Sequence, residues 1–433
     1  MARLHRQAAM EQPARRQSDP LWWCVGIAFG FAVLAAIRLG IPSKPYFDEV
    51  HYIPAARTLT DLVAPANVEH PLLGKALFAG GMALFGDGPV GWRIVPWASG
   101  VLGLFGFMRM LWWASFSRAT TVIAGVLLAT SFLWIVHARH AMLDGPMAGF
   151  ALLAAWAFVR GLREPTRARW QFALAGVLMG LSLGTKWSVA PLLVLPGLAF
   201  LWAKLRDEGA RGLVAKEGGA VPGMRLAEAA LWLGLLPLAA YWLTFAPAFF
   251  YATDPLSPFD VIGHHQRMIW LQASVVEEHP YQSVWWQWIF NLRGIWYLYE
   301  VTDGAQRGIM LIGNPVTMYL GLAALALCGW RWVRSGEMLW LAPPLAWAAL
   351  MGLWVIAEKP VQFYFHYLLP ALALMAALAL VTGRWWDEGR RWPAYAATIG
   401  AVLACAYFWP VLSAGALENN QAFLKWAWWS GWR

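Results

Sequence analysis

Long apolar runs, each close to 20 residues, are the feature that most constrains this chain. Of its 433 residues, 60% are hydrophobic, 31 are Trp and only 13% are charged. A water-soluble core cannot hide so much apolar surface, whereas lipid can act as its solvent, and a helix of about 20 residues crosses a bilayer. The composition therefore predicts an all-α integral membrane protein.

Eleven runs have the length expected of membrane-spanning helices. They cover residues 21–41, 89–111, 119–137, 144–160, 170–185, 187–204, 227–250, 308–328, 337–357, 361–381 and 393–412. The first run follows a basic leader but lacks an A-x-A-like cleavage site, so we expect it to remain as a span. Cys24, Cys328 and Cys405 each fall inside such a run and are expected to fill the core.

Basic residues give the expected orientation. Twenty of the 33 Lys and Arg residues cluster in the N-terminus and in alternate loops, which the eleven spans place on one face. Loops of this kind stay in the cytoplasm. The tail at 1–20 is therefore predicted to be cytoplasmic and the tail at 413–433 to lie outside. The net charge of +9 belongs to these loops rather than to a nucleic-acid-binding surface.

The transmembrane domain is expected over residues 21–412, with two long outer loops at 42–88 and 251–307. The first outer loop contains the apolar stretch 72–86, which is too short to span comfortably and is predicted to form a helix in the membrane interface.

Polar residues collect on the predicted outer face. Eight of the nine histidines lie there: His51, His70, His137, His140, His264, His265, His279 and His366. So do Asp48, Glu49, Glu69, Lys75, Arg93, Arg139, Asp144, Lys186, Glu277 and Glu278. Any one of these residues can be explained as a solvated loop residue or a snorkelling side chain. Burying charge at helix ends is costly, however, so the set as a whole indicates a functional site.

The stretch "KPYFDEVHY" places Asp48 and Glu49 just after the first span, where a lipid headgroup would lie. Adjacent loop carboxylates usually point different ways, so one can act on a substrate while the other orients a neighbour. The cations of "EHPLLGK", "ARHAMLDGP" and "GTKWS" suit a phosphate, and the carboxylates suit a base.

Seven segments carry a family resemblance. "FDEVHY", "EHPLLGK", "GWRIVPWASG", "ARHAMLDGP", "GTKWS", "HPYQSVWWQW" and "FYFHYLLPA" resemble, in this order, motifs of the dolichyl-phosphate-mannose protein O-mannosyltransferases. The resemblance runs from about residue 20 to 412 and implies a GT-C fold. The sequence differs from the family in two places. The 251–307 loop is too short for the β-trefoil insert of the eukaryotic enzymes, and "EHPLLGK" has a Leu where the family often has a second Pro.

The resemblance implies inverting transfer of mannose from a polyprenyl phosphate to Ser or Thr hydroxyls of exported proteins. It also implies roles: Asp48 resembles the catalytic carboxylate and Glu49 its neighbour. The donor phosphate and sugar are expected to contact His70, Lys75, Arg93, Arg139, Asp144, Lys186, His279 and His366. No cofactor or metal is required in this scheme, although the outer His and carboxylates leave a divalent cation possible.

Three other functions fit parts of the pattern. A GT-C transferase with a lipid or glycan acceptor, similar to the aminoarabinose transferases of lipid A, shares the Asp-Glu pair but typically adds a soluble domain after its last span. A proton-coupled transporter needs charges at mid-span and inverted repeats. A non-catalytic assembly subunit leaves the pair unexplained. The compact loops favour a bacterial inner membrane, with the site on its outer side.

Overall fold

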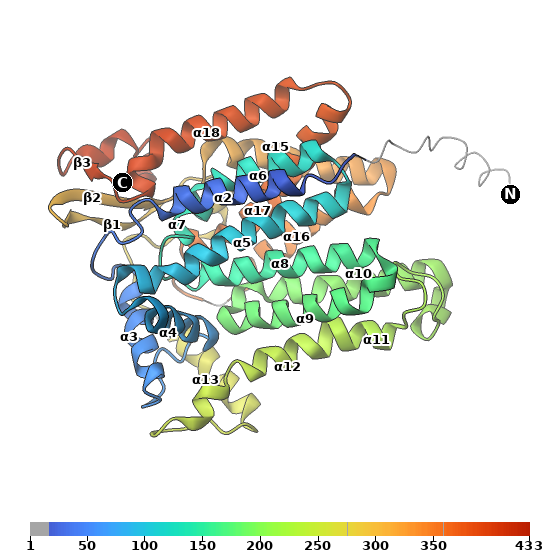
Figure 1. Cartoon of the computed structure of the whole chain (residues 1–433), viewed down its shortest axis with the longest axis horizontal. Helices are drawn as coiled ribbons and strands as arrows, with labels where there is room; N and C mark the ends of the chain where they lie inside the picture. Colours follow the sequence, from blue (N-terminus) through green and yellow to red (C-terminus); the bar gives the residue numbers. More distant parts are fainter. Residues whose placement is uncertain (1–16, 275, 358) are drawn as a thin grey trace.

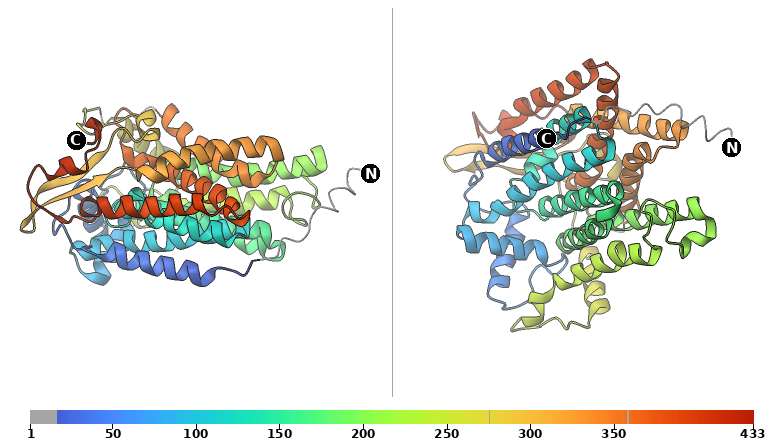
Figure 2. Two further views of the ribbon diagram at one scale, coloured as in Figure 1. Left: turned by 90° about the horizontal axis from the view of Figure 1, so that it is seen from above. Right: turned by 45° about the vertical axis from the view of Figure 1, so that its right-hand side comes forward.

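The computed structural model describes residues 17–274, 276–357 and 359–433. The predicted cytoplasmic tail therefore lies outside the described residues except for residues 17–20. Long helices lie side by side in one bundle, which Figures 1 and 2 show from three directions. They are α2 (Leu21–Ala36), α5 (Pro89–Ser115), α6 (Arg118–Ala129), α8 (Asp144–Arg163), α9 (Ala168–Thr185), α10 (Ala190–Glu208), α12 (Leu236–Leu243), α15 (Pro315–Ser335), α16 (Met338–Ile356), α17 (Leu368–Asp387) and α18 (Trp392–Leu412).

Each of the eleven predicted spans overlaps one of these helices. Eight of the described helical segments are long and apolar enough to cross a membrane alone, while α2 and α6 are shorter apolar helices. The structure is thus that of a multi-pass helical membrane protein, and the count of eleven spans stays a prediction.

Helix α17 is the centre of the bundle. Its apolar stretch is entirely buried, and it packs against α6, α15, α16 and α18. Helices α5, α8 and α9 pack beside one another and approach closely at small residues. A Cβ on Gly103 of α5 would lie 2.8 Å from the Trp134 ring, so only glycine allows this contact.

Two predicted spans are interrupted. The run at 119–137 forms α6 and α7 (Phe132–His137), because the Ser131 hydroxyl accepts a hydrogen bond from the Trp134 amide and starts a new helix. The run at 227–250 forms α11 (Leu226–Ala230), a π-helical turn (Leu231–Leu235) and α12, and Pro237, at the start of α12, has no amide hydrogen to continue a regular ladder.

A small antiparallel sheet, absent from the prediction, corrects one boundary. Strands β1 (Ile295–Thr302) and β2 (Ala305–Leu311) form a hairpin around Asp303 and Gly304, and β3 (Ala416–Leu417) pairs with β2. The prediction that a span begins at residue 308 is wrong. The helix α15 begins at Pro315, where the Asn314 side chain accepts from the Val316 amide at 3.1 Å.

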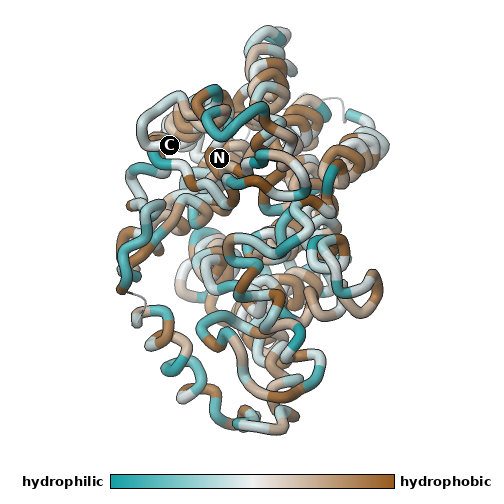
Figure 3. Tube along the Cα trace, turned by 90° about the vertical axis from the view of Figure 1, so that its left-hand side faces the viewer, coloured by the Kyte–Doolittle hydropathy of each residue, from teal (hydrophilic) through white to brown (hydrophobic). Residues whose placement is uncertain are grey.

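The sheet lies at one end of the bundle, here named the sheet end. Figure 1 shows α3 (Glu49–Thr60), α4 (Leu73–Phe85), α13 (Val261–Ala273) and the C-terminus at this end, and α11 toward the other. The short helix α14 (Trp285–Ile289) also belongs to the second long loop. Figure 3 looks onto the sheet end and shows hydrophilic segments spread over its loops. The two long loops thus meet at one end of the bundle.

Candidate active site

Asp48 and Glu49 lie at the start of α3, and their side chains have different surroundings. Glu49 is 1% exposed, and its carboxylate accepts from Arg93 Nε at 2.9 Å and Nη2 at 2.8 Å. It also accepts from the Ala141 amide at 2.9 Å. A carboxylate with three such partners is held rigidly.

Arg93 is fully buried and has no donor directed elsewhere. Besides Glu49, its guanidinium donates to the carbonyls of Leu39, Pro42 and Lys44 at 3.1, 2.8 and 3.4 Å. The pair therefore fastens the loop before α3 to α5. Arg93 therefore positions these segments. It has no N–H left to bind a phosphate, which is the role that the sequence suggested.

Asp48 is oriented differently from its neighbour. Its carboxylate is not used to cap α3, and it accepts a long hydrogen bond from the Tyr52 hydroxyl at 3.4 Å. Burial raises the pKa of Asp48 above its usual range, and the positive charge of Lys186 is the strongest influence in the opposite direction. Asp48 is thus a recessed carboxylate close to a cation.

Lys186, the cation close to Asp48, takes part in a buried ion pair. Its Nζ lies 2.7 Å from Asp144 Oδ2, with both side chains buried, and 4.6 Å from the centroid of the Phe365 ring. Asp144 begins α8, whereas Lys186 lies in the turn between α9 and α10. An ammonium carries three N–H donors, so the ion pair with Asp144 leaves donors for a further anion.

Lys359 was missed by the sequence reasoning. It lies just after α16, and burial lowers its pKa to about 8, helped by the positive charge of Lys186 and opposed by the negative charges of Asp48 and Asp144. The only signal was a lysine directly following an apolar run, in "AEKP". We name Asp48, Asp144, Lys186, Lys359 and His70 the polar cluster.

His70 is joined to this cluster through Tyr52, since the centroids of the two rings lie 5.9 Å apart and the Tyr52 hydroxyl donates to Asp48. Burial lowers its pKa well below the usual range, and the positive charges of Lys186 and Lys359 add to the effect. Lys75 has another place: its ammonium donates to the carbonyls of Asn67 and His70, the latter at 2.9 Å. Lys75 therefore shapes the loop before α4.

The remaining predicted site residues are spread around the sheet end. Arg139 is buried and donates to the carbonyls of Ala35 and Ser413, which connects the ends of α2 and α18. His366 is buried with its ring stacked 3.7 Å from that of Trp354. His279 lies on an exposed loop, where its Nδ1 accepts from the Tyr281 amide at 3.1 Å.

An apolar cavity of about 600 Å³ lies between α8, α9, α10 and α16. Phe158, Met179, Leu193 and Leu345 are among its lining side chains. Helix α10 begins just after Lys186 and α16 ends just before Lys359, and the two helices pack together. The cavity is lined by the first half of α10, close to Lys186, and by residues 338–346 of α16, and α16 runs from there to the end that precedes Lys359.

Metal ligands do not gather in this region. Within residues 17–433, apart from 275 and 358, no three His, Cys, Asp or Glu side chains come together as a metal site.

Two protein-family models match the chain. "Dolichyl-phosphate-mannose-protein mannosyltransferase" matches residues 69–217, and "C-terminal four TMM region of protein-O-mannosyltransferase" matches residues 259–432. The polyprenol-phosphate-mannose–protein mannosyltransferase of Mycobacterium tuberculosis is 28% identical, over 90% of this chain and 87% of the relative. That of Corynebacterium glutamicum is 27% identical, over 81% and 79%.

Solved structures show the same fold. The Saccharomyces cerevisiae Pmt1-Pmt2 complex, bound to the sugar donor, has a TM-score of 0.81 at 14% identity, covering 95% of this chain and 92% of that one. ArnT from Cupriavidus metallidurans has a TM-score of 0.55 at 18% identity, covering 93% and 67%. The fold is thus GT-C, and the chain belongs to the dolichyl-phosphate-mannose protein O-mannosyltransferase family.

Proposed function

We propose that this protein transfers mannose from a polyprenyl-phosphate-mannose donor to Ser and Thr hydroxyls of exported proteins. The observation that carries the proposal is the recessed Asp48 carboxylate beside the Lys186 and Lys359 cations, at the end of helices that line an apolar cavity. The names of the mycobacterial and corynebacterial relatives give the same donor and a protein acceptor.

The donor is an amphiphile, and we assign its apolar chain and its phosphate to different parts of the structure. The polyprenyl chain fits the apolar cavity between α10 and α16, since burying apolar chains is favourable by about 25 cal/mol per Å². The phosphate then lies where these helices end, at Lys186 and Lys359. Two preorganised ammonium groups in a site that excludes much of the water stabilise the charge that develops on a departing phosphate.

Asp48 acts as the general base. The acceptor hydroxyl oxygen attacks the anomeric carbon from the side opposite the phosphate, its proton passes to the Asp48 carboxylate, and the bond between the sugar and the phosphate oxygen breaks. The products are an inverted mannosyl Ser or Thr and a polyprenyl phosphate. A pKa raised by burial makes Asp48 a better base than an exposed aspartate.

The other predicted residues divide into three groups. His70, a member of the polar cluster, is assigned to the donor, and Asp144 orients Lys186. Glu49, Arg93, Lys75 and Arg139 position loops through buried hydrogen bonds. His366, stacked on Trp354, and His279, on the exposed loop, are placed to line the edges of the site. No metal or other cofactor takes part in this scheme.

The membrane is a bacterial inner membrane, with the N-terminus in the cytoplasm and the sheet end outside. The basic loops support this orientation, since the predicted cytoplasmic loops lie at the end of the bundle opposite the polar cluster.

The test is transfer in vitro. Purified protein in lipid, mixed with labelled polyprenyl-phosphate mannose and a Ser/Thr peptide, should yield labelled peptide in buffer containing EDTA. Labelled lipid or glycan in place of peptide would instead support the aminoarabinose-transferase type of acceptor, and no transfer to any acceptor would refute the proposal.

A further inference from the structure

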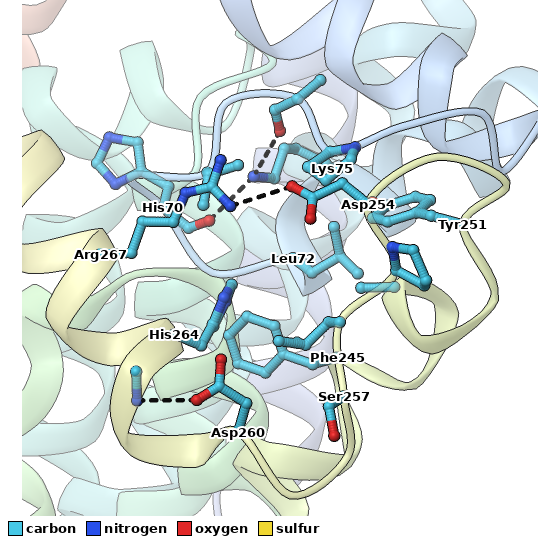
Figure 4. Close-up of a pocket in the computed structure, with 17 residues that line it drawn as sticks. His70, Leu72, Lys75, Phe245, Tyr251, Asp254, Ser257, Asp260, His264 and Arg267 are labelled. Atoms are coloured by element: carbon cyan, nitrogen blue, oxygen red, sulfur yellow. Dashed lines mark hydrogen bonds and ion pairs between the residues drawn. The ribbon is translucent and has the colours of Figure 1, made fainter.

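A second cavity, separate from the apolar one, opens at the sheet end and is shown in Figure 4. Its volume is about 230 Å³, and three segments line it: residues 65–75, residues 245–257 and the first part of α13. In Figure 4, His70, Lys75 and Asp254 lie toward one end, Asp260 and Ser257 toward the other, and His264 and Phe245 between them.

Hydrogen bonds between the lining segments hold the walls of this cavity. The amides of Ala252 and Thr253 donate to the carbonyls of Leu62 and Val63 at 2.8 and 2.9 Å. On the opposite wall, Gln272 of α13 donates to the Glu69 carbonyl at 2.8 Å. A cavity with walls fixed in this way loses little freedom when a ligand enters, which favours binding.

The lining of this cavity combines apolar and polar side chains. Leu72, Phe245 and Tyr251 provide apolar surface, and Tyr251 is almost fully buried. His264 Nε2 has no hydrogen-bond partner among the described residues, and burial lowers the pKa of His264 to about 4, so the ring is neutral at physiological pH. A neutral imidazole beside apolar walls suits an uncharged polar ligand.

The charged side chains of the lining are largely engaged. Arg267 Nη1 lies 3.2 Å from Asp254 Oδ2, and Asp260 Oδ1 accepts from the Gly263 amide at 3.1 Å. The two lining cations thus have partners among the described residues, Arg267 with Asp254 and Lys75 with the backbone carbonyls of Asn67 and His70. The cavity is also too small and too polar for a polyprenyl chain.

His70 connects this cavity to the polar cluster. It is one of the lining residues, and the centroid of its ring lies 5.9 Å from that of Tyr52, whose hydroxyl donates to the Asp48 carboxylate. A ligand here would lie beside the reacting groups, yet it would contact segments that differ from the α10 and α16 helices assigned to the donor.

From these observations we infer that this cavity, which we name the α13 pocket, binds the acceptor polypeptide next to its Ser or Thr. One or two uncharged side chains flanking the acceptor hydroxyl enter between α13 and the 245–257 segment, while the hydroxyl reaches the polar cluster past His70. The inference rests on the proposed function, because it takes the acceptor to be a polypeptide.

The test places a bulky side chain at the rim of the pocket. Ser257→Trp fills the opening, and Gln266→Trp, on the exposed side of α13, is the matched control. In the peptide transfer assay, Ser257→Trp should raise the KM for peptide at least tenfold and leave donor affinity and kcat at saturating peptide within about twofold of the unmodified protein. Gln266→Trp should change none of these values.

A second measurement does not depend on turnover. Ser257→Cys should react with a water-soluble thiol reagent, and the acceptor peptide should slow this reaction whereas the donor should not. Unchanged peptide KM in Ser257→Trp, or labelling that the peptide does not slow, would overturn the inference even if mannose transfer proceeds normally. Protection by the donor alone would also overturn it, since the pocket would then belong to the donor site. Absence of any transfer by the unmodified protein would instead refute the proposed function.

Discussion

Glu49→Gln is the substitution for which sequence and structure give different expectations. The sequence placed Glu49 beside the base as its catalytic neighbour, whereas the structure pairs it with Arg93, and the two side chains are 1% and 0% exposed. Gln keeps the size of Glu but removes the charge that compensates a buried guanidinium. Breaking a buried ion pair in this way costs about 3–5 kcal/mol.

We therefore expect Glu49→Gln to lower the free energy of unfolding by about 3–5 kcal/mol, with transfer lost in proportion to folded protein. The matched control is Glu300→Gln, which removes the charge from an exposed pair with Lys44 at 2.9 Å. An exposed pair contributes at most about 1 kcal/mol, so this variant should stay near the stability of the unmodified protein.

The assay is denaturant unfolding in mixed micelles, followed by Trp fluorescence, with transfer measured on the same preparations. The double variant Glu49→Leu with Arg93→Met should recover part of the lost stability, because it removes the uncompensated charge. Recovery is incomplete because the carbonyls of Leu39 and Pro42 lose their donor. A Glu49→Gln protein that is as stable as the unmodified one but inactive would refute the positioning role and indicate a part in the chemistry.

Three further predictions concern the donor and the base. Lys359→Met should weaken donor binding at least tenfold and leave the peptide KM unchanged; equal donor affinity in a direct binding assay would exclude Lys359 from the phosphate site. Transfer should decline as pH falls through the Asp48 pKa, which lies above the usual aspartate value because the carboxylate is buried, and the Lys186 charge limits this rise. In Lys359→Met the acidic limb of a single-turnover pH profile should move to higher pH, since Lys359 also lowers the Asp48 pKa; an unmoved limb would contradict Asp48 as the titrating base. Leu193→Trp, in the apolar cavity, should reduce affinity for a long-chain polyprenyl donor more than for a short-chain analogue, and equal losses would place the chain elsewhere.

Helices were predictable from the sequence because apolar runs of fixed length leave few other structures in lipid. The prediction that a span starts at residue 308 was wrong because the apolar residues of β2 lie just before the apolar residues of α15. A hairpin signal was present: Asp303 and Gly304 stand between two apolar segments, and both take positive φ values, 47° and 73°. An apolar strand next to an apolar helix is not separable by composition alone.

The sequence placed several residues of the candidate site on one face, but it did not predict how they pair. The sequence brought Asp48, Asp144 and Lys186 to one face, and the structure places them together. It did not reveal that Arg93 binds Glu49, because these residues are 44 positions apart and their contact depends on how α5 packs against the first loop. Lys359 was overlooked because one lysine after a span usually anchors a helix at the interface.

The central claim, that Asp48 is the general base, is tested most directly by single-turnover transfer with Asp48→Asn. Asn keeps the size of Asp but cannot accept the hydroxyl proton, and losing a general base costs on the order of 100- to 10,000-fold in rate. We predict this loss of rate together with unchanged donor binding on the same preparation, since none of the proposed donor contacts is made by Asp48. Transfer at a near-normal rate would contradict the account and direct attention to Asp144.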